Sequence, residues 1–151
     1  MQAVLRNWAL SLFVVVVTAA GIPVATAADP FDGKWKMVSI EHAGMKLPDD
    51  LVTKIPSQIH FELGKVRVVV GDKVLMEGTY MFDETKTPKT FTMSGLKDRK
   101  GNEKKLQGIF EINDKGQLRT CVTTADSEKL PTSFDTKANP GSDLTTYEKV
   151  R

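Results

Sequence analysis

Alternation of apolar and polar residues is the feature of this sequence that most constrains its fold. From about residue 34 onward, apolar side chains recur at every second position in short runs, and turn residues separate the runs about every eight to twelve positions. Apolar spacing typical of helices is scarce. Because alternate side chains of a strand point to opposite faces, the pattern predicts an all-β barrel or sandwich.

Eight strands follow from this pattern. They are expected at about residues 34–42, 57–63, 65–70, 74–82, 89–94, 105–112, 117–123 and 143–150. Between the first two strands, Pro48, Asp49 and Asp50 could start a single helical turn that Pro56 ends. We expect this segment, residues 43–56, to be a lid or a plug over one barrel end.

The pairing of neighbouring strands can be tested on the sequence, because apolar side chains of one face must meet across each hairpin. A two-residue turn at residues 64–65 would pair Leu63 with Val66. At the next turn we expect a three-residue connection, residues 71–73, or a bulge, which places Val68 opposite Met76. The further apolar pairs are Phe82 with Phe91, Tyr80 with Met93, Met93 with Leu106, and Ile112 with Leu118.

These pairs collect one continuous apolar face. Consecutive strands joined by short hairpins form an up-and-down meander, and closing eight of them removes exposed edges that would invite aggregation. We therefore expect an eight-stranded antiparallel up-and-down barrel. The first strand is apolar on both faces, which a bulge near Met37 or contact with two neighbouring strands would explain.

Residues 1–27 have the order of a secretory signal peptide: Arg6, an apolar run from Trp8 to Ala20, helix breakers, and a small-x-small end at Ala27. The alternative is a membrane anchor, but the apolar run is about 13 residues where a span needs roughly 20. We expect cleavage near Ala27 and no stable membrane insertion afterwards. Residues 28–151 then form one secreted or periplasmic domain.

The charge and cysteine content of the chain limit which binding partners are expected. Beyond residue 27 the chain carries 20 basic and 19 acidic residues, so its charge is near +1 and no nucleic acid is expected as a partner. The single cysteine, Cys121, cannot close an internal disulfide and is interpreted as a small buried hydrophobe.

No catalytic or metal-binding motif stands out. His60 and Glu62 share an outward face, and His42 ends another strand, so a metal site would need separate elements to converge. Nucleophile elbows, His-Glu-x-x-His helices and phosphate-binding glycine loops are missing from the sequence. The basic loop at residues 97–105 is interpreted as a solvated hairpin turn. We therefore expect no enzyme, no metal and no cofactor.

Several stretches of the chain resemble known proteins. Gly33-Lys34-Trp35 resembles the Gly-x-Trp of lipocalins. The further stretches are "DGKWKMVSIEHAGMKLP", "EGTYMFD", "KTPKTFTM", "GIFEIND", "LRTC" and "PTSFDTKANPGSDLTTYEKVR". Through them, almost all of residues 28–151 is similar to exported, uncharacterised lipocalin-like domains abundant in planctomycete bacteria. Leu130 departs from this family, where a basic residue would be expected. The resemblance implies that Trp35 closes the barrel base, with Lys149 or Arg151 packed over it.

An eight-stranded barrel is either filled by its side chains or holds one small ligand. Large side chains favour filling, whereas Gly78 and Gly108 could open a hollow. We expect a lipocalin-like binding module for a small apolar ligand; the alternative is a filled barrel that acts as a protein-interaction or inhibitor module through loops 43–56 and 94–105. The expected ligand-binding residues are Trp35, Phe61, Met76, Tyr80, Phe91, Met93 and Phe110.

Overall fold

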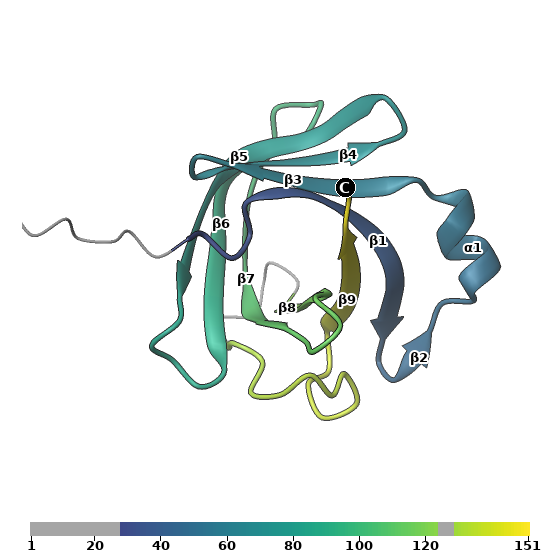
Figure 1. Cartoon of the computed structure of the whole chain (residues 1–151), viewed down its shortest axis with the longest axis vertical. Coiled ribbons are helices and arrows are strands. Elements are labelled where there is room, and N and C mark those ends of the chain that lie inside the picture. Colours follow the sequence, from purple (N-terminus) through teal and green to yellow (C-terminus); the bar gives the residue numbers. More distant parts are fainter. Residues whose placement is uncertain (1–27, 124–128) are drawn as a thin grey trace, which may run out of the picture.

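A computed structural model describes residues 28–123 and 129–151. The expected signal peptide, residues 1–27, lies outside the described residues. The elements, drawn in Figure 1, are β1 (Gly33–His42), β2 (Met45–Lys46), α1 (Asp49–Lys54), β3 (Ser57–Glu62), β4 (Lys65–Val70), β5 (Lys73–Asp83), β6 (Lys89–Lys97), β7 (Glu103–Ile112), β8 (Leu118–Thr123) and β9 (Ser142–Lys149).

The strands form a closed antiparallel barrel, as the sequence predicts. In the described residues neighbouring strands pair in the order β2-β1-β3-β4-β5-β6-β7-β8-β9, and a further pairing of β1 with β9 closes the sheet. Eight strands make up the barrel. The ninth, β2, has two residues and pairs only with the end of β1.

Strand β1 holds the closure together because it pairs with strands on both sides. Trp35 lies opposite Ile59 of β3 and also opposite Lys149 of β9. The register with β9 shifts between Met37 and Ser39, which confirms the bulge expected near Met37. The bulge changes which alternate residues point inward, so Trp35 before it and Ile40 after it both face the barrel interior.

The hairpin between β3 and β4 differs from the predicted register. Phe61 pairs with Val66, so the turn consists of Leu63 and Gly64 rather than residues 64–65. Both turn residues have positive φ, 49° and 77°, as a type I′ turn requires. The observed pairing differs from the predicted one by two residues, so the same side chains still face inward. Leu63, however, lies outside the strand and is 92% exposed. The predicted register is wrong here because Leu63 belongs to the turn and not to the strand.

The expected bulge between β4 and β5 is confirmed. Val68 lies opposite Met76, as predicted, and the register then shifts so that Val69 lies opposite Val74. The four further apolar pairs predicted along β5, β6, β7 and β8 also form as expected. Strand β6 runs on past residue 94, where we expected its end, and buries Leu96 completely.

The segment between β1 and β3 contains the expected helical turn, but it does not plug the barrel. Helix α1 begins after Pro48 and lies beside β1 at the outside of the barrel (Figure 1). Val52 is buried, whereas Met45 and Leu51 are 72% and 41% exposed. Within residues 28–123 and 129–151, no helix is long and apolar enough to cross a membrane.

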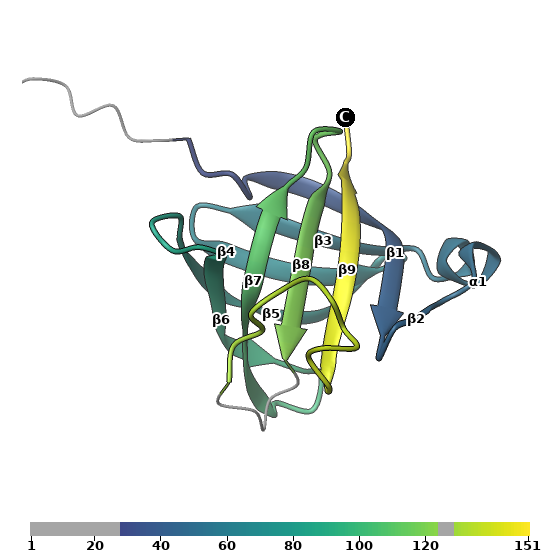
Figure 2. The ribbon, with the colours of Figure 1, turned by 90° about the horizontal axis from the view of Figure 1, so that it is seen from below.

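Among the described residues, two clusters of apolar side chains form the core. The larger one lies inside the barrel and includes Phe31, Trp35 and Phe61. The smaller one lies on the outer face, where Phe134 of the segment before β9 covers Cys121 and its neighbours on β7 and β9. Figure 2 shows this segment crossing the outside of β7, β8 and β9. Cys121 is fully buried there, as expected for a small hydrophobe.

Candidate functional site

One end of the barrel is filled by aromatic side chains around Phe31. This residue comes from the segment before β1 and is fully buried. Its ring centroid lies 4.6 Å from that of Phe110 and 4.8 Å from that of Phe61. The rings of Tyr80, Phe82 and Phe91 lie within 5.8 Å of it. Such tilted and edge-on ring pairs are favourable beyond the area that they bury. Phe31, rather than residues 43–56, therefore plugs this end of the barrel.

Polar contacts hold the plug segment in place. The indole Nε1 of Trp35 donates a hydrogen bond of 2.6 Å to the carbonyl oxygen of Phe31. The hydroxyl of Tyr80 donates to the carboxylate of Asp29, and the same carboxylate accepts the backbone N–H of Phe31. Burial, followed by the hydrogen bond and charge of Asp29, raises the pKa of Tyr80 well above its usual range. The phenol therefore stays protonated and keeps donating to the plug segment.

Trp35 also lies at this end of the barrel, next to Phe31. It is 2% exposed, and the Nζ atom of Lys149 lies 5.3 Å from the centroid of its ring. This is the arrangement that the lipocalin resemblance implied, with Lys149 in the basic position. A cation over an indole is attracted by the negative face of the ring, so the contact joins β1 to β9 where the barrel closes.

The other half of the barrel is hollow. A cavity of about 230 Å³ lies inside it, and its lining includes Phe61, Met76 and Met93 of the seven expected ligand-binding residues. The other four, Trp35, Tyr80, Phe91 and Phe110, pack in the aromatic end instead. The structure therefore combines the two alternatives that the sequence left open. The remaining lining residues are Ile40, Ile59, Val68, Leu106, Leu118, Thr120, Val122, Thr123, Asp143, Thr145 and Tyr147.

The wall of this cavity is uneven in polarity. Its apolar side chains come mostly from β3 to β8, whereas Asp143, Thr145 and Tyr147 come from β9. Burial raises the pKa of Tyr147, and hydrogen bonding from the side chains of Thr145 and Thr120 acts in the opposite direction. This polar stripe is not among the residues predicted from the sequence, although the alternation of residues 143, 145 and 147 places them on one face of the strand.

A carboxylate and an imidazole meet at the end of the barrel opposite Trp35. The Nδ1 atom of His42 lies 2.7 Å from Oδ1 of Asp143, and the two residues are opposite one another on β1 and β9. Both side chains reach solvent, with 59% and 38% of their surface exposed. Asp143 is thus the charged residue that borders the cavity at its rim.

Gly78 and Gly108 do not create the hollow, contrary to one interpretation of the sequence. Neither residue lines the cavity. A Cβ atom at Gly108 would overlap the carbonyl oxygen of Cys121, and one at Gly78 would lie 2.5 Å from that of Ser94. Both glycines are needed because the backbone of the neighbouring strand approaches closely.

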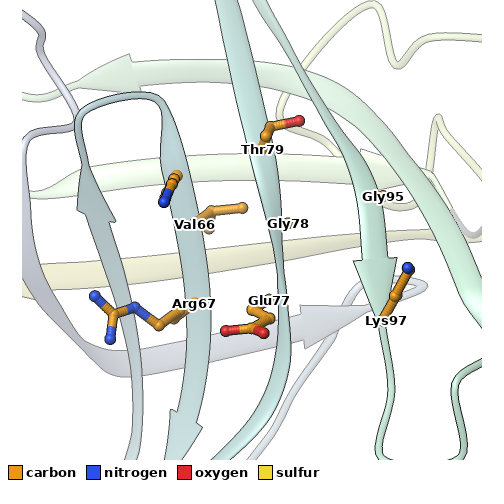
Figure 3. Close-up of a pocket in the computed structure, with 8 residues that line it drawn as sticks. Val66, Arg67, Glu77, Gly78, Thr79, Gly95 and Lys97 are labelled. Atoms are coloured by element: carbon orange, nitrogen blue, oxygen red, sulfur yellow. The ribbon is translucent and has the colours of Figure 1, made fainter.

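A groove on the outside of β4, β5 and β6 is a second candidate, shown in Figure 3. It encloses about 540 Å³ and is bordered by Lys65, Arg67, Glu77 and Lys97. Arg67 and Lys97 lie on either side of Glu77, and their charged ends do not converge on one point (Figure 3). The groove therefore lacks the focused charge that would select a ligand.

The histidines and the cysteine do not form a reactive cluster. Among the described residues, no group of three or more His, Cys, Asp or Glu side chains lies close enough to hold a metal ion. The His60 ring contacts Gln58 at 2.9 Å, and burial with the nearby charges of Lys34 and Arg67 lowers its pKa. Burial raises the pKa of the Cys121 thiol, which disfavours the nucleophilic thiolate.

Comparison of the chain with protein-family models, with curated proteins and with solved structures found no significant match.

Proposed function

We propose that the protein is an exported lipocalin-like binding module that takes a small apolar molecule into its barrel. The observation that carries the proposal is the cavity of about 230 Å³ inside a closed barrel, bordered mainly by apolar side chains. An apolar cavity of roughly 150 Å³ is enough to hold benzene. On that scale the present cavity suits a guest of roughly nine or ten non-hydrogen atoms.

Two further features support this assignment. The aromatic plug around Phe31 and Trp35 closes one barrel end, so a guest would have a fixed floor and a single entrance. Met76 and Met93 border the cavity, and their flexible side chains can adapt to guests of different shape. The order of residues 1–27 supports export, and the resemblance to exported lipocalin-like domains agrees with a binding role rather than a catalytic one.

Calorimetric titration of the exported, processed protein with 1-octanol tests the proposal. This neutral probe has the size that the cavity suits, and we expect saturable binding of one molecule per chain. Val68→Phe, which adds bulk inside the cavity, should weaken binding at least tenfold. Val69→Phe is the matched control, because Val69 neighbours Val68 on β4 and does not line the cavity. No binding by the unchanged protein, or equal binding by both variants, would contradict the proposal.

The second candidate is a protein-interaction or inhibitor module that acts through loops. It is favoured by the exposed side chains of Met45, Leu51 and Ile55, which are 72%, 41% and 43% exposed on one stretch of chain. Under this alternative, 1-octanol would not bind. The double variant Met45→Ser, Leu51→Ser would instead lower the affinity for a protein partner that the unchanged protein binds.

A further inference from the structure

The cavity has a polar stripe along one strand. Asp143, Thr145 and Tyr147 alternate along β9 and all border the cavity, so they share the inward face of the barrel. Across the pairing with β8, Thr145 lies opposite Thr120 and Tyr147 lies opposite Leu118. A guest would therefore meet apolar side chains on most sides and hydrogen-bonding groups on this one.

The polar groups near the floor of the cavity are already satisfied. The side chains of Thr145 and Thr120 act on the Tyr147 hydroxyl through hydrogen bonding. Thr120 and Thr145 are buried, and within the described residues no fully buried side-chain nitrogen or oxygen lacks a partner. Because a satisfied network gains little from a new partner, these hydroxyls do not select a polar guest strongly.

The rim of the cavity is different. Among the residues that the structure describes, Asp143 is the one lining residue with a formal charge, and no described lysine or arginine lines the cavity. Its Oδ1 atom contacts His42, which leaves Oδ2 for a guest. Lys149, the cation that follows on β9, lies six residues further along, which is about 20 Å in an extended strand. The guest's polar end would thus meet a carboxylate whose Oδ1 atom contacts the His42 ring, and no described lysine or arginine lies beside it on the cavity wall.

From this distribution we infer that the cavity selects small primary alkylamines, with the ammonium group at Asp143 and the alkyl chain among Val68, Met76 and Leu106. This inference rests on the proposed function and names its ligand class. A charge-assisted hydrogen bond from an ammonium to a carboxylate is stronger than one between neutral groups. An alkyl carboxylate of the same length would be repelled by Asp143 at this rim. An alcohol would bind with an affinity between those of the amine and the carboxylate.

The test compares n-octylamine, 1-octanol and octanoate on the exported, processed protein at neutral pH, with dissociation constants measured by calorimetry. We expect n-octylamine to bind at least tenfold more tightly than octanoate, with 1-octanol in between. In Asp143→Asn the three probes should bind with similar affinity, because the rim charge is gone while the alkyl site remains. Asp72→Asn removes the same charge from the turn between β4 and β5 and should leave the preference unchanged.

The possible results separate the inference from the proposed function. If 1-octanol binds but octanoate binds as tightly as n-octylamine, the inference is overturned and the binding function remains. The same conclusion follows if Asp143→Asn keeps the preference, or if Asp72→Asn loses it. If none of the three probes binds, the proposed function fails and the inference falls with it. A preference for the amine that only Asp143→Asn abolishes supports both.

Discussion

Lys149 lies over the ring of Trp35, with its Nζ atom 5.3 Å from the ring centroid, and so joins the last strand of the barrel to the first. The backbones of the two residues are also opposite one another in the pairing of β1 with β9. The same two residues therefore connect β1 and β9 through both their backbones and their side chains.

Loss of this contact should weaken the closure measurably. We expect Lys149→Ala to lower the free energy of unfolding by about 0.5–1 kcal/mol, the size of a cation–π contact at an exposed position. Urea unfolding followed by circular dichroism measures the change. Lys149→Arg keeps a cation over the indole and should restore most of the loss. An alanine variant as stable as the unchanged protein would show that the contact contributes nothing.

Phe31 should contribute far more, because its ring is fully buried among five aromatic neighbours. Phe31→Ala is expected to lower the free energy of unfolding by about 3–5 kcal/mol, through lost burial and the space left behind. Phe31→Leu keeps part of the apolar volume and should recover roughly half of that loss. Equal stability of Phe31→Ala and the unchanged protein would mean that the plug is not part of the folded core.

The turn between β3 and β4 offers a stabilising substitution. Leu63 has a φ of 49° and is 92% exposed, so it bears backbone strain without gaining burial. A left-handed conformation costs an ordinary residue about 1–2 kcal/mol, and asparagine adopts it more readily. We expect Leu63→Asn to raise the free energy of unfolding by up to about 1 kcal/mol. Leu63→Ala, which keeps the Cβ atom and hence the strain, should change it by less than about 0.5 kcal/mol.

The two tyrosines of the chain, Tyr80 and Tyr147, should resist ionisation while the protein is folded. Burial is the leading cause that raises the pKa of each above the ordinary value of 10.0. An acid whose pKa is higher in the folded state adds stability below its unfolded pKa, and this stability is lost as the pH rises above it. The protein should therefore lose stability above about pH 10.

Tyrosinate absorbance in the near ultraviolet measures this directly. The folded protein should show little tyrosinate at a pH where the urea-unfolded protein is about half ionised. Tyr80→Phe should reduce the alkaline loss of stability, because that variant has one fewer group to ionise on unfolding. Identical titration curves for the folded and unfolded protein would contradict the burial of both phenols.

The sequence predicted the fold well wherever the strands are regular. The pairing of Phe82 with Phe91 followed from matching apolar faces alone, and it forms as expected. Leu63 shows where this reasoning fails: an apolar residue in a turn looks like a strand residue, and only the backbone geometry separates the two. Alternation therefore predicts which residues share a face better than it predicts where a strand ends.

The candidate site was less predictable, for two physical reasons. Phe31 lies before the first strand, where no alternation marks it, so its burial in the barrel had no signal beyond a large aromatic ring between two turn residues. The cavity depends on small differences in side-chain volume along the axis of the barrel. Phe61, Met76 and Met93 border the empty part and Phe110 the filled part, although all four occupy inward positions that look equivalent in the sequence.

The position of Phe31 also affects the order of folding. The rings that surround it come from residues as far along the chain as Phe110, so nearly 80 further residues must be synthesised before Phe31 can pack in its native place. Contacts between residues so distant in sequence slow the search for the native state. Until the later strands have been synthesised, the Phe31 ring stays exposed and can be bound by chaperones of the nascent chain. Once the ring is buried in the barrel, that binding site is gone.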